Sequence, residues 1–298
     1  MLTQTVVEIQ GLVKDYGPVH ALRGIDLDLR QGEVFGFLGP NGAGKTTTLR
    51  CLLGLLRPTA GRVSAFGLDA QADGVAVRAR ATYVPGELRL PDHLTGNELV
   101  STIEQIRGRS DDARRLELAE RLGLDLGRPL RDLSTGNRRK VALLLAFLPD
   151  AELIVLDEPT SGLDPLLQRV FLELVREAKA RGATVFLSSH VLSEVQRAAD
   201  RVAVLRLGRV IAEGTVEELR KTARQRIEIW FETAVPELLA RGAAGLTDVA
   251  VEDHRLTATL TGPIQPLLDD LAGARVASML VEEPDLEDAF LDLYQAPA

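Results

Sequence analysis

One short segment has residue types and spacing suited to holding phosphate groups. It consists of Gly39, Pro40, Asn41, Gly42, Ala43, Gly44, Lys45 and Thr46. Glycines let backbone N–H groups turn toward phosphate oxygens, and the start of a helix adds a positive dipole end. In this pattern Lys45 reaches the β- and γ-phosphates, and the Thr46 hydroxyl is a ligand for Mg²⁺. An apolar run precedes the segment and a helical pattern follows it to about residue 56. We therefore predict a strand–loop–helix nucleotide site rather than a glycine-rich turn.

A second set of candidate residues follows another apolar run. Residues 153–156 are all apolar and predict a buried strand, after which come Asp157 and Glu158. Open α/β sheets bind ligands at the carboxyl ends of their strands, which places Asp157 for a Mg²⁺ shell and Glu158 for an attacking water. Alone, such an acidic pair is more often a loop cap. Together with the loop at 39–46, it favours a hydrolytic site.

The surrounding elements alternate between strands and helices, which is typical of a layered α/β domain. Helical patterns fill 92–148, and Asp164 is a predicted N-cap for a helix over 165–181. Residues 215–218 form a capping box that opens a further helix. Strands are predicted at 6–14, 25–29, 34–38, 153–156, 183–187, 201–207 and 210–213.

The pattern changes after about residue 222, where we place a domain boundary. The predicted elements are a strand at 226–231, a helix at 236–241, a hairpin of 247–252 and 255–260, a helix at 264–272, a strand at 276–281 and a helix at 285–294. This β-α-β-β-α-β order suggests a small α+β accessory domain with a ferredoxin-like arrangement. We therefore expect a nucleotide-binding domain over 1–222 and the accessory domain over 223–298.

Composition argues against several other functions. The chain of 298 residues has a net charge of −8, which does not suit general nucleic-acid binding through Lys and Arg. Its one cysteine, Cys51, forms no internal disulfide and no cysteine cluster for zinc. The start of the chain lacks the pattern of a secretory signal. The apolar run at 141–148 is far shorter than the ~20 residues of a membrane span. We expect a chain that does not cross a membrane.

Together, these segments resemble the ATP-binding subunit of an ABC transporter over about residues 5 to 220. The text "GPNGAGKTT", which ends at Thr47, resembles the Walker A loop of this family, and "LIVLDEP" resembles its Walker B strand. The text "LSTGNRRK" (133–140) resembles the family signature, and "TSGLD" (160–164) its D-loop. His190 ends "FLSSH" at the position of the switch histidine, and Tyr16 resembles the aromatic residue that stacks on adenine.

The resemblance implies a P-loop core with an N-terminal antiparallel β subdomain and a helical subdomain at about 88–150. It also implies a head-to-tail pair of subunits, either two copies or one copy with a similar ATPase, around two ATP molecules. The signature of one chain would then face the γ-phosphate that the other chain holds. That signature consists of Ser134, Thr135, Gly136 and Asn137.

The same resemblance assigns roles at the catalytic centre. Glu158 is expected to be the general base or to orient the water, and His190 to bind the γ-phosphate. Asp164 would help to shape the opposing site, and Thr46 and Asp157 would bind Mg²⁺. We interpret the basic run at 138–140 as a solvated face, with a phosphate or partner contact as the alternative.

Residues 83–87, Tyr-Val-Pro-Gly-Glu, differ most from the family pattern. The family usually has a glutamine at the position of Gly86, and that glutamine contacts Mg²⁺ and the attacking water. We hypothesise that Glu87 supplies this contact one residue later, through the metal, because a carboxylate beside a γ-phosphate is unfavourable without a cation between them. The alternative is that Glu87 is solvated. Thr135 and Asn137 also differ from the usual Leu-Ser-Gly-Gly-Gln.

The text "VEEPDLEDAFLDLY" (281–294) resembles the end of ATPases that serve ABC-2-type exporters, including drug and antibiotic resistance pumps. This implies a cytoplasmic ATPase, peripheral on the inner face of the cell membrane, that drives an ABC-2-like permease and exports a small molecule, drug or lipid. The alternatives are a soluble ABC ATPase for DNA repair or ribosome work and a P-loop nucleotide kinase. The former predicts tandem ATPase halves, a coiled-coil insertion or a basic face, and the latter needs neither a signature nor His190.

Overall fold

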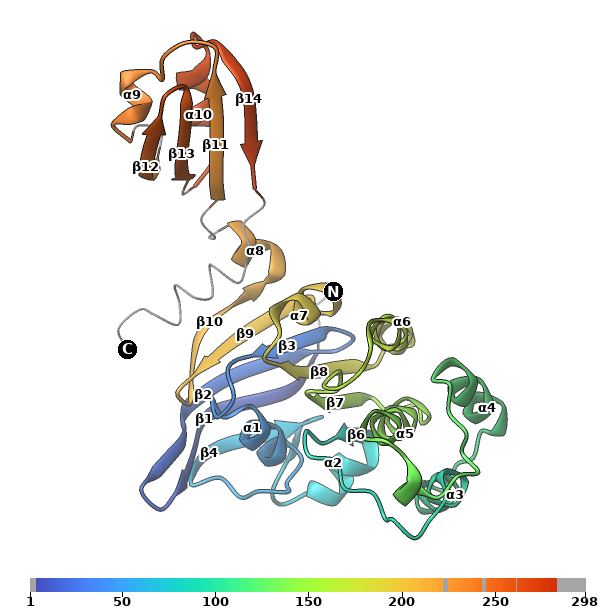
Figure 1. The fold of residues 1–298 in the computed structure, drawn as a ribbon. Coiled ribbons are helices and arrows are strands. Elements are labelled where there is room, and N and C mark those ends of the chain that lie inside the picture. Colours follow the sequence, from blue (N-terminus) through green and yellow to red (C-terminus); the bar gives the residue numbers. More distant parts are fainter. Residues whose placement is uncertain (1–3, 222–224, 243–244, 261, 283–298) are drawn as a thin grey trace. The chain divides into compact units, whose positions relative to one another are not determined.

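The computed structural model describes residues 4–221, 225–242, 245–260 and 262–282. The chain divides into two compact units, Met1–Glu213 and Gly214–Ala298 (Figure 1). This division lies ahead of the boundary that we predicted after residue 222. The connecting helix α8 (Val216–Lys221) therefore falls in the second unit. It begins with the predicted capping box, in which Thr215 and Glu218 exchange backbone and side-chain hydrogen bonds of 2.8 and 3.1 Å.

A six-stranded sheet forms the centre of the first unit. Its order is β10 (Arg209–Thr215), β9 (Arg201–Arg206), β3 (Val34–Leu38), β8 (Thr184–Ser189), β7 (Leu153–Asp157) and β6 (Ala81–Val84). From β9 to β6 the neighbouring strands are parallel. All residues of β3, β7 and β8 are buried, as expected for strands covered on both faces. The predicted α/β class is confirmed.

Helices flank the strands of this sheet along the chain: one follows β3, one precedes β6, and two connect β7 to β8 and β8 to β9. They are α1 (Lys45–Leu52), α2 (Gly74–Arg80), α6 (Pro165–Ala180) and α7 (Leu192–Ala198) (Figure 1). The prediction extended α1 to about residue 56, which is four residues too long. The helix stops because Gly54 adopts φ +62° and its backbone approaches Ala70, whose carbonyl oxygen would lie 2.2 Å from an added Cβ.

An antiparallel sheet forms the predicted N-terminal β subdomain. Its order is β2 (Val19–Arg30), β1 (Thr5–Tyr16), β4 (Ala60–Ala65) and β5 (Leu68–Asp69). Buried residues of this sheet belong to one hydrophobic cluster with Phe35 and Phe186 of the central sheet. The rings of Phe35 and Phe186 pack edge to face with centroids 5.7 Å apart. The two sheets thus share a core.

Three helices and one turn of 3₁₀ helix form the predicted helical segment. They are α3 (Gly96–Arg107), α4 (Asp112–Arg121), the 3₁₀ turn Leu130–Asp132 and α5 (Thr135–Phe147) (Figure 1). A capping box of Thr95 and Glu98 fixes the start of α3. Helix α5 also packs against the central layers, where Phe147 contacts Phe171 of α6 with ring centroids 6.3 Å apart. It therefore belongs to both the helical segment and the core.

The second unit contains the predicted β-α-β-β-α-β order. The elements are β11 (Gln225–Phe231), α9 (Glu237–Ala240), β12 (Leu246–Glu252), β13 (Arg255–Leu260), α10 (Gln265–Leu271) and β14 (Val276–Val281). The antiparallel sheet has the order β12-β13-β11-β14, so the first strand lies between the third and the fourth, as in a ferredoxin-like domain. The helix predicted at 285–294 lies outside the described residues. Among the helices that the structure describes, none has the length and apolar character of a membrane span.

Candidate nucleotide-hydrolysis site

The loop between β3 and α1 lies at the carboxyl end of the central sheet. Gly44 is the N-cap of α1 with φ +114°, and a Cβ there would lie 2.5 Å from Leu22 Cδ2 and 2.9 Å from the Ala21 carbonyl oxygen. A Cβ on Gly39 would lie 2.5 Å from the Leu205 carbonyl oxygen. A side chain at Gly39 or Gly44 would therefore clash with neighbouring atoms, so packing as well as the phosphate-binding sequence pattern requires glycine at both positions.

Lys45 points back into this loop. Its side chain is 4% exposed, and Nζ donates hydrogen bonds to the carbonyl oxygens of Gly39 at 2.6 Å and Pro40 at 3.3 Å. The same Nζ lies 3.2 Å from Glu158 Oε1. The loop and its lysine thus form a compact cradle at the start of a helix, where an anion is stabilised by N–H groups and the dipole.

Glu158 links the two halves of the predicted site. Its Oε2 lies 3.2 Å from His190 Nδ1, whereas its other oxygen, Oε1, makes the contact with Lys45. Its backbone has φ +48°, an uncommon conformation for a residue with a side chain, and strain of this kind concentrates at functional sites. Lys45, Glu158 and His190 are 32 to 145 positions apart in the sequence, and they meet at one end of the sheet.

Asp157 has the surroundings of a metal ligand. Its side chain is fully buried, and Oδ1 accepts a hydrogen bond of 2.6 Å from Ser188 Oγ. Oδ2 is buried and receives no hydrogen bond from the described residues. An orphaned buried carboxylate oxygen is costly, and Mg²⁺ binds such oxygens together with hydroxyl groups. Asp157 and Thr46, in the first turn of α1, thus fit the donor set that the sequence predicted.

The remaining predicted residues occupy helix starts or exposed positions. Ser134 caps α5 and accepts a hydrogen bond of 3.3 Å from the Asn137 N–H, and Asp164 caps α6. The Tyr16 ring is 49% exposed at the end of β1, with Lys14 Nζ 5.0 Å from its centroid. In the part of the chain that the structure describes, no hydrogen bond or ion pair joins these groups to Lys45 or Glu158.

The segment 83–87 lies directly against Asp157. A Cβ on Gly86 would lie 3.2 Å from Asp157 Oδ2, and Glu87 is exposed. The Tyr83 hydroxyl is buried nearby, and burial, followed by the negative charge of Asp157, raises the pKa of Tyr83 above its usual value of 10.0. The loop that departs most from the family pattern therefore borders the predicted metal site.

The interpretation of 138–140 as a solvated basic face is wrong for Arg139. This side chain is 7% exposed, and its two terminal nitrogens donate hydrogen bonds of 2.9 Å to the carbonyl oxygens of Pro85 and Gly86. Arg138 is half-buried and pairs with Asp92 at 2.9 Å. Arg139 and Ser188 are the site residues that the sequence reasoning missed. The position of Ser188, two residues before His190 on the strand next to β7, is the one signal that pointed to it.

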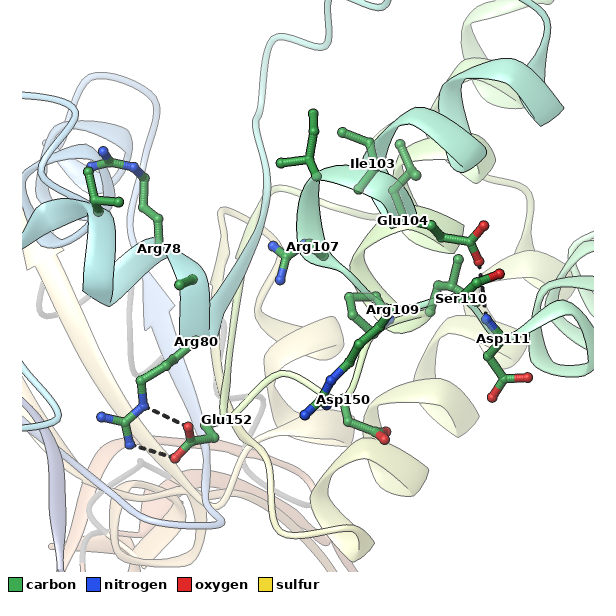
Figure 2. A pocket seen from close by; sticks show the side chains of 16 residues that line it. Arg78, Arg80, Ile103, Glu104, Arg107, Arg109, Ser110, Asp111, Asp150 and Glu152 are labelled. Atoms are coloured by element: carbon green, nitrogen blue, oxygen red, sulfur yellow. Dashed lines mark hydrogen bonds and ion pairs between the residues drawn. The ribbon is translucent and has the colours of Figure 1, made fainter.

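A groove of about 870 Å³ lies between α2, the end of α3 and the connection from α5 to β7 (Figure 2). Arg80 and Glu152 form a bidentate ion pair on its wall, with N–O distances of 2.6 and 2.7 Å. Val75 and Ile106 are 77% and 76% exposed. The Arg109 guanidinium has no hydrogen bond or ion pair with the residues that the structure describes. The groove thus combines apolar surface with the positive charge of Arg109, which has no acidic partner among the described residues.

Known proteins resemble the chain in sequence over nearly its whole length. A family model described as ABC transporter matches residues 22–161. Daunorubicin resistance ATP-binding protein DrrA3 of Streptomyces coeruleorubidus is 37% identical, with 98% of this chain and 96% of that protein covered. Nod factor export ATP-binding protein I of Burkholderia orbicola is 33% identical, with 96% of each chain covered.

Solved structures resemble the chain in fold over about three quarters of its length. A structure described as the ATP binding subunit of an ABC transporter is 32% identical, with a TM-score of 0.68, and the alignment covers 72% of this chain and 92% of that one. The ADP conformation of MJ1267, an ATP-binding cassette of an ABC transporter, is 26% identical with a TM-score of 0.61, over 72% of this chain and 93% of that one.

Proposed function

The chain belongs to the family of ABC transporter ATP-binding subunits, which are ATPases, and on that premise we propose that it drives a transmembrane permease that exports a small molecule, drug or lipid. The observation that carries the hydrolytic part is the position of Glu158 between Lys45 and His190, at 3.2 Å from each. Export is supported by the relatives, which are named for daunorubicin resistance and Nod factor export.

Positioning and electrostatics account for most of the catalysis of phosphoryl transfer. Residues 39–47, including Thr47, surround the phosphates with N–H groups, and Lys45 exchanges its carbonyl and Glu158 partners for phosphate oxygens. This exchange releases the Glu158 carboxylate to orient or deprotonate the attacking water, and His190 donates to the γ-phosphate. Thr46 and Asp157 would hold Mg²⁺, which when bound neutralises phosphate charge.

A second subunit completes this proposal. The first turn of α5 is accessible, since Ser134 and Thr135 are exposed. Together with Gly136 and Asn137 they can present a helix N-terminus to an ATP held by another copy or by a similar ATPase. Asp164 at the start of α6 serves the opposing site, and the exposed ring of Tyr16 stacks on adenine.

Glu87 remains our candidate for the contact that glutamine makes elsewhere in the family. Gly86 leaves no side chain between this loop and Asp157 Oδ2, and Glu87 is exposed, so its carboxylate is free to swing toward a metal. Glu87→Gln and Glu87→Ala test the idea by Mg²⁺ titration of the ATPase rate. We expect both to need more Mg²⁺, whereas wild-type dependence in both would leave Glu87 as a solvated residue.

The groove between α2 and α3 suits a segment of the permease. A cytosolic segment with apolar side chains and one acidic residue would cover Val75 and Ile106 and pair with Arg109. Such docking would hold the subunit peripherally on the inner face of the membrane. Arg109→Glu is expected to lower the yield of the co-purifying ABC-2-like permease several-fold while ATP hydrolysis by the isolated chain is retained. An unchanged yield of the permease would mean that it binds to another surface of the chain.

Hydrolysis itself is tested with the purified chain and ATP without any phosphate acceptor. We expect steady release of inorganic phosphate that Lys45→Ala abolishes. Phosphate release only after addition of a nucleotide acceptor would instead indicate a kinase. Tagged chain purified from detergent-solubilised membranes should bring down a membrane protein. Recovery of ribosomes or DNA-repair proteins in its place would favour the soluble alternative.

A further inference from the structure

A buried arginine joins helix α5 to the loop that precedes α3. Arg139 is 7% exposed, and each of its terminal nitrogens donates a 2.9 Å hydrogen bond to a different carbonyl oxygen, those of Pro85 and Gly86. The two planar donors match two successive carbonyls, a geometry that the point charge of a lysine does not reproduce. The contact therefore fixes the backbone of Gly86 relative to α5.

The cation is held in this position at an electrostatic cost. Burial lowers the pKa of Arg139, and the negative charges of Asp157 and Glu158 offset part of that effect. A buried charge is unfavourable unless it is paired and hydrogen-bonded. Among the described residues, the Arg139 guanidinium donates hydrogen bonds to carbonyl oxygens alone, so the negative charges of Asp157 and Glu158 are what compensates its burial. The guanidinium is thus attracted electrostatically to the end of the sheet that carries Asp157 and Glu158.

The loop that Arg139 holds has a defined position against the predicted metal ligand. A Cβ on Gly86 would lie 3.2 Å from Asp157 Oδ2, the oxygen that has no hydrogen bond in the described part of the chain. Any movement of the Gly86 backbone therefore changes the space beside that oxygen. It also changes the direction in which the next residue, Glu87, leaves the loop.

We propose that Arg139 is a positioning residue that couples the first turn of α5 to the loop of Gly86 and so sets the metal side of the catalytic site. The inference rests on the proposed function for the meaning of that first turn, which carries Ser134 to Asn137. Arg139 lies five positions after Ser134 in one continuous helix, Thr135–Phe147. A shift of the helix start on contact with a second nucleotide therefore moves Arg139, and with it both carbonyls.

The contact by which Arg139 holds the Gly86 loop is tested first without nucleotide, by cleavage after Glu87 with a glutamate-specific protease. Arg139→Lys keeps the charge but loses at least one of the two hydrogen bonds, so we expect cleavage after Glu87 to accelerate about tenfold or more. Lys140→Arg is the matched control on the same helix, because the Lys140 ammonium makes no hydrogen bond or ion pair with the residues that the structure describes, and this variant should be cleaved at the wild-type rate. If Arg139→Lys were cleaved after Glu87 as slowly as the wild-type chain, the proposal that Arg139 holds the loop would be wrong. Should Arg139→Lys fold poorly, Arg139→Gln replaces it.

The second test separates positioning from a structural role. In Arg139→Lys we expect ATP affinity in EDTA, measured by calorimetry, to stay within twofold of wild type. The Mg²⁺ concentration for half-maximal hydrolysis should rise at least threefold. A fall in thermal stability with unchanged Mg²⁺ dependence would overturn the coupling. If the wild-type chain releases no phosphate from ATP, the proposed function fails, while the protease comparison still decides whether Arg139 holds the loop.

Discussion

Substitution of Glu158 by glutamine tests the centre of the proposed site with the smallest change of shape. The carboxylate lies 3.2 Å from Lys45 Nζ through one oxygen and 3.2 Å from His190 Nδ1 through the other. Glutamine keeps one oxygen acceptor and the side-chain length, but it loses the negative charge and most of the basicity. Hydrolysis and binding should therefore respond in opposite ways.

The expected loss of rate follows from the role of a general base. Proton transfer by a positioned side chain contributes about 10²- to 10⁴-fold. At about 1.36 kcal/mol for each factor of ten, this corresponds to a barrier about 2.7 to 5.4 kcal/mol higher. Binding should hold or improve, because the carboxylate no longer competes with phosphate for Lys45. Two unit charges about 5 Å apart repel by about 3 kcal/mol at an effective dielectric constant of about 20, which is an upper limit for the gain.

The assay pairs steady-state phosphate release with calorimetric ATP binding. Glu173→Gln is the control, since its carboxylate is 59% exposed on α6 and touches only Arg121 at 3.4 Å among the described residues. We expect the control to stay within twofold of wild type in both measurements. The reasoning is refuted if Glu158→Gln keeps more than a tenth of the wild-type rate, or if its ATP affinity falls more than tenfold.

Three further predictions concern packing and ionisation. Gly44→Ala should destabilise the chain by more than about 2 kcal/mol in urea denaturation and weaken ATP binding, because its Cβ would meet Leu22 at 2.5 Å in a conformation that L-residues avoid. Ser188→Ala should lower the free energy of unfolding by about 1.5–3 kcal/mol, the typical contribution of a hydrogen bond to a charged group such as Asp157. Burial raises the pKa of Cys51 from 9.0 to about 11. Its contribution to stability is therefore complete below pH 9 and lost as pH rises through about 11, and iodoacetamide at pH 8 should label it only after unfolding.

Local sequence patterns predicted the elements that carry most of the site. The apolar runs 34–38 and 153–156 match β3 and β7 to within one residue, because strands covered on both faces need continuous apolar sequence. The cap at Asp164 was predictable for a similar reason, since its carboxylate serves the N–H groups of the next residues, Leu166 and Leu167.

The contacts that complete the site depend on residues far apart in the chain. Arg139 is buried only because the carbonyls of Pro85 and Gly86, more than 50 positions earlier, lie across from α5. In sequence it is the middle of three basic residues and indicates a solvated face. Ser188 likewise meets Asp157 only because β7 and β8 are neighbours in the sheet. Sheet order and helix packing decide such contacts, and a local pattern does not encode them.

On the proposals above, Arg139 and Glu87 would together take the role that one glutamine usually has in this family. Arg139 donates a hydrogen bond to the Gly86 carbonyl oxygen, and Glu87 would offer the polar group that the glycine lacks. If both act through this loop, their effects are coupled, because a mobile loop cannot direct Glu87 and a missing carboxylate leaves nothing to direct.

The double variant Arg139→Lys/Glu87→Gln should therefore need no more Mg²⁺ than the more impaired single variant. Residues that act independently would instead multiply their effects, so two threefold shifts would give about ninefold. Titration of the four proteins under one set of conditions distinguishes these outcomes. A multiplicative result would mean that Arg139 and Glu87 influence hydrolysis by separate routes.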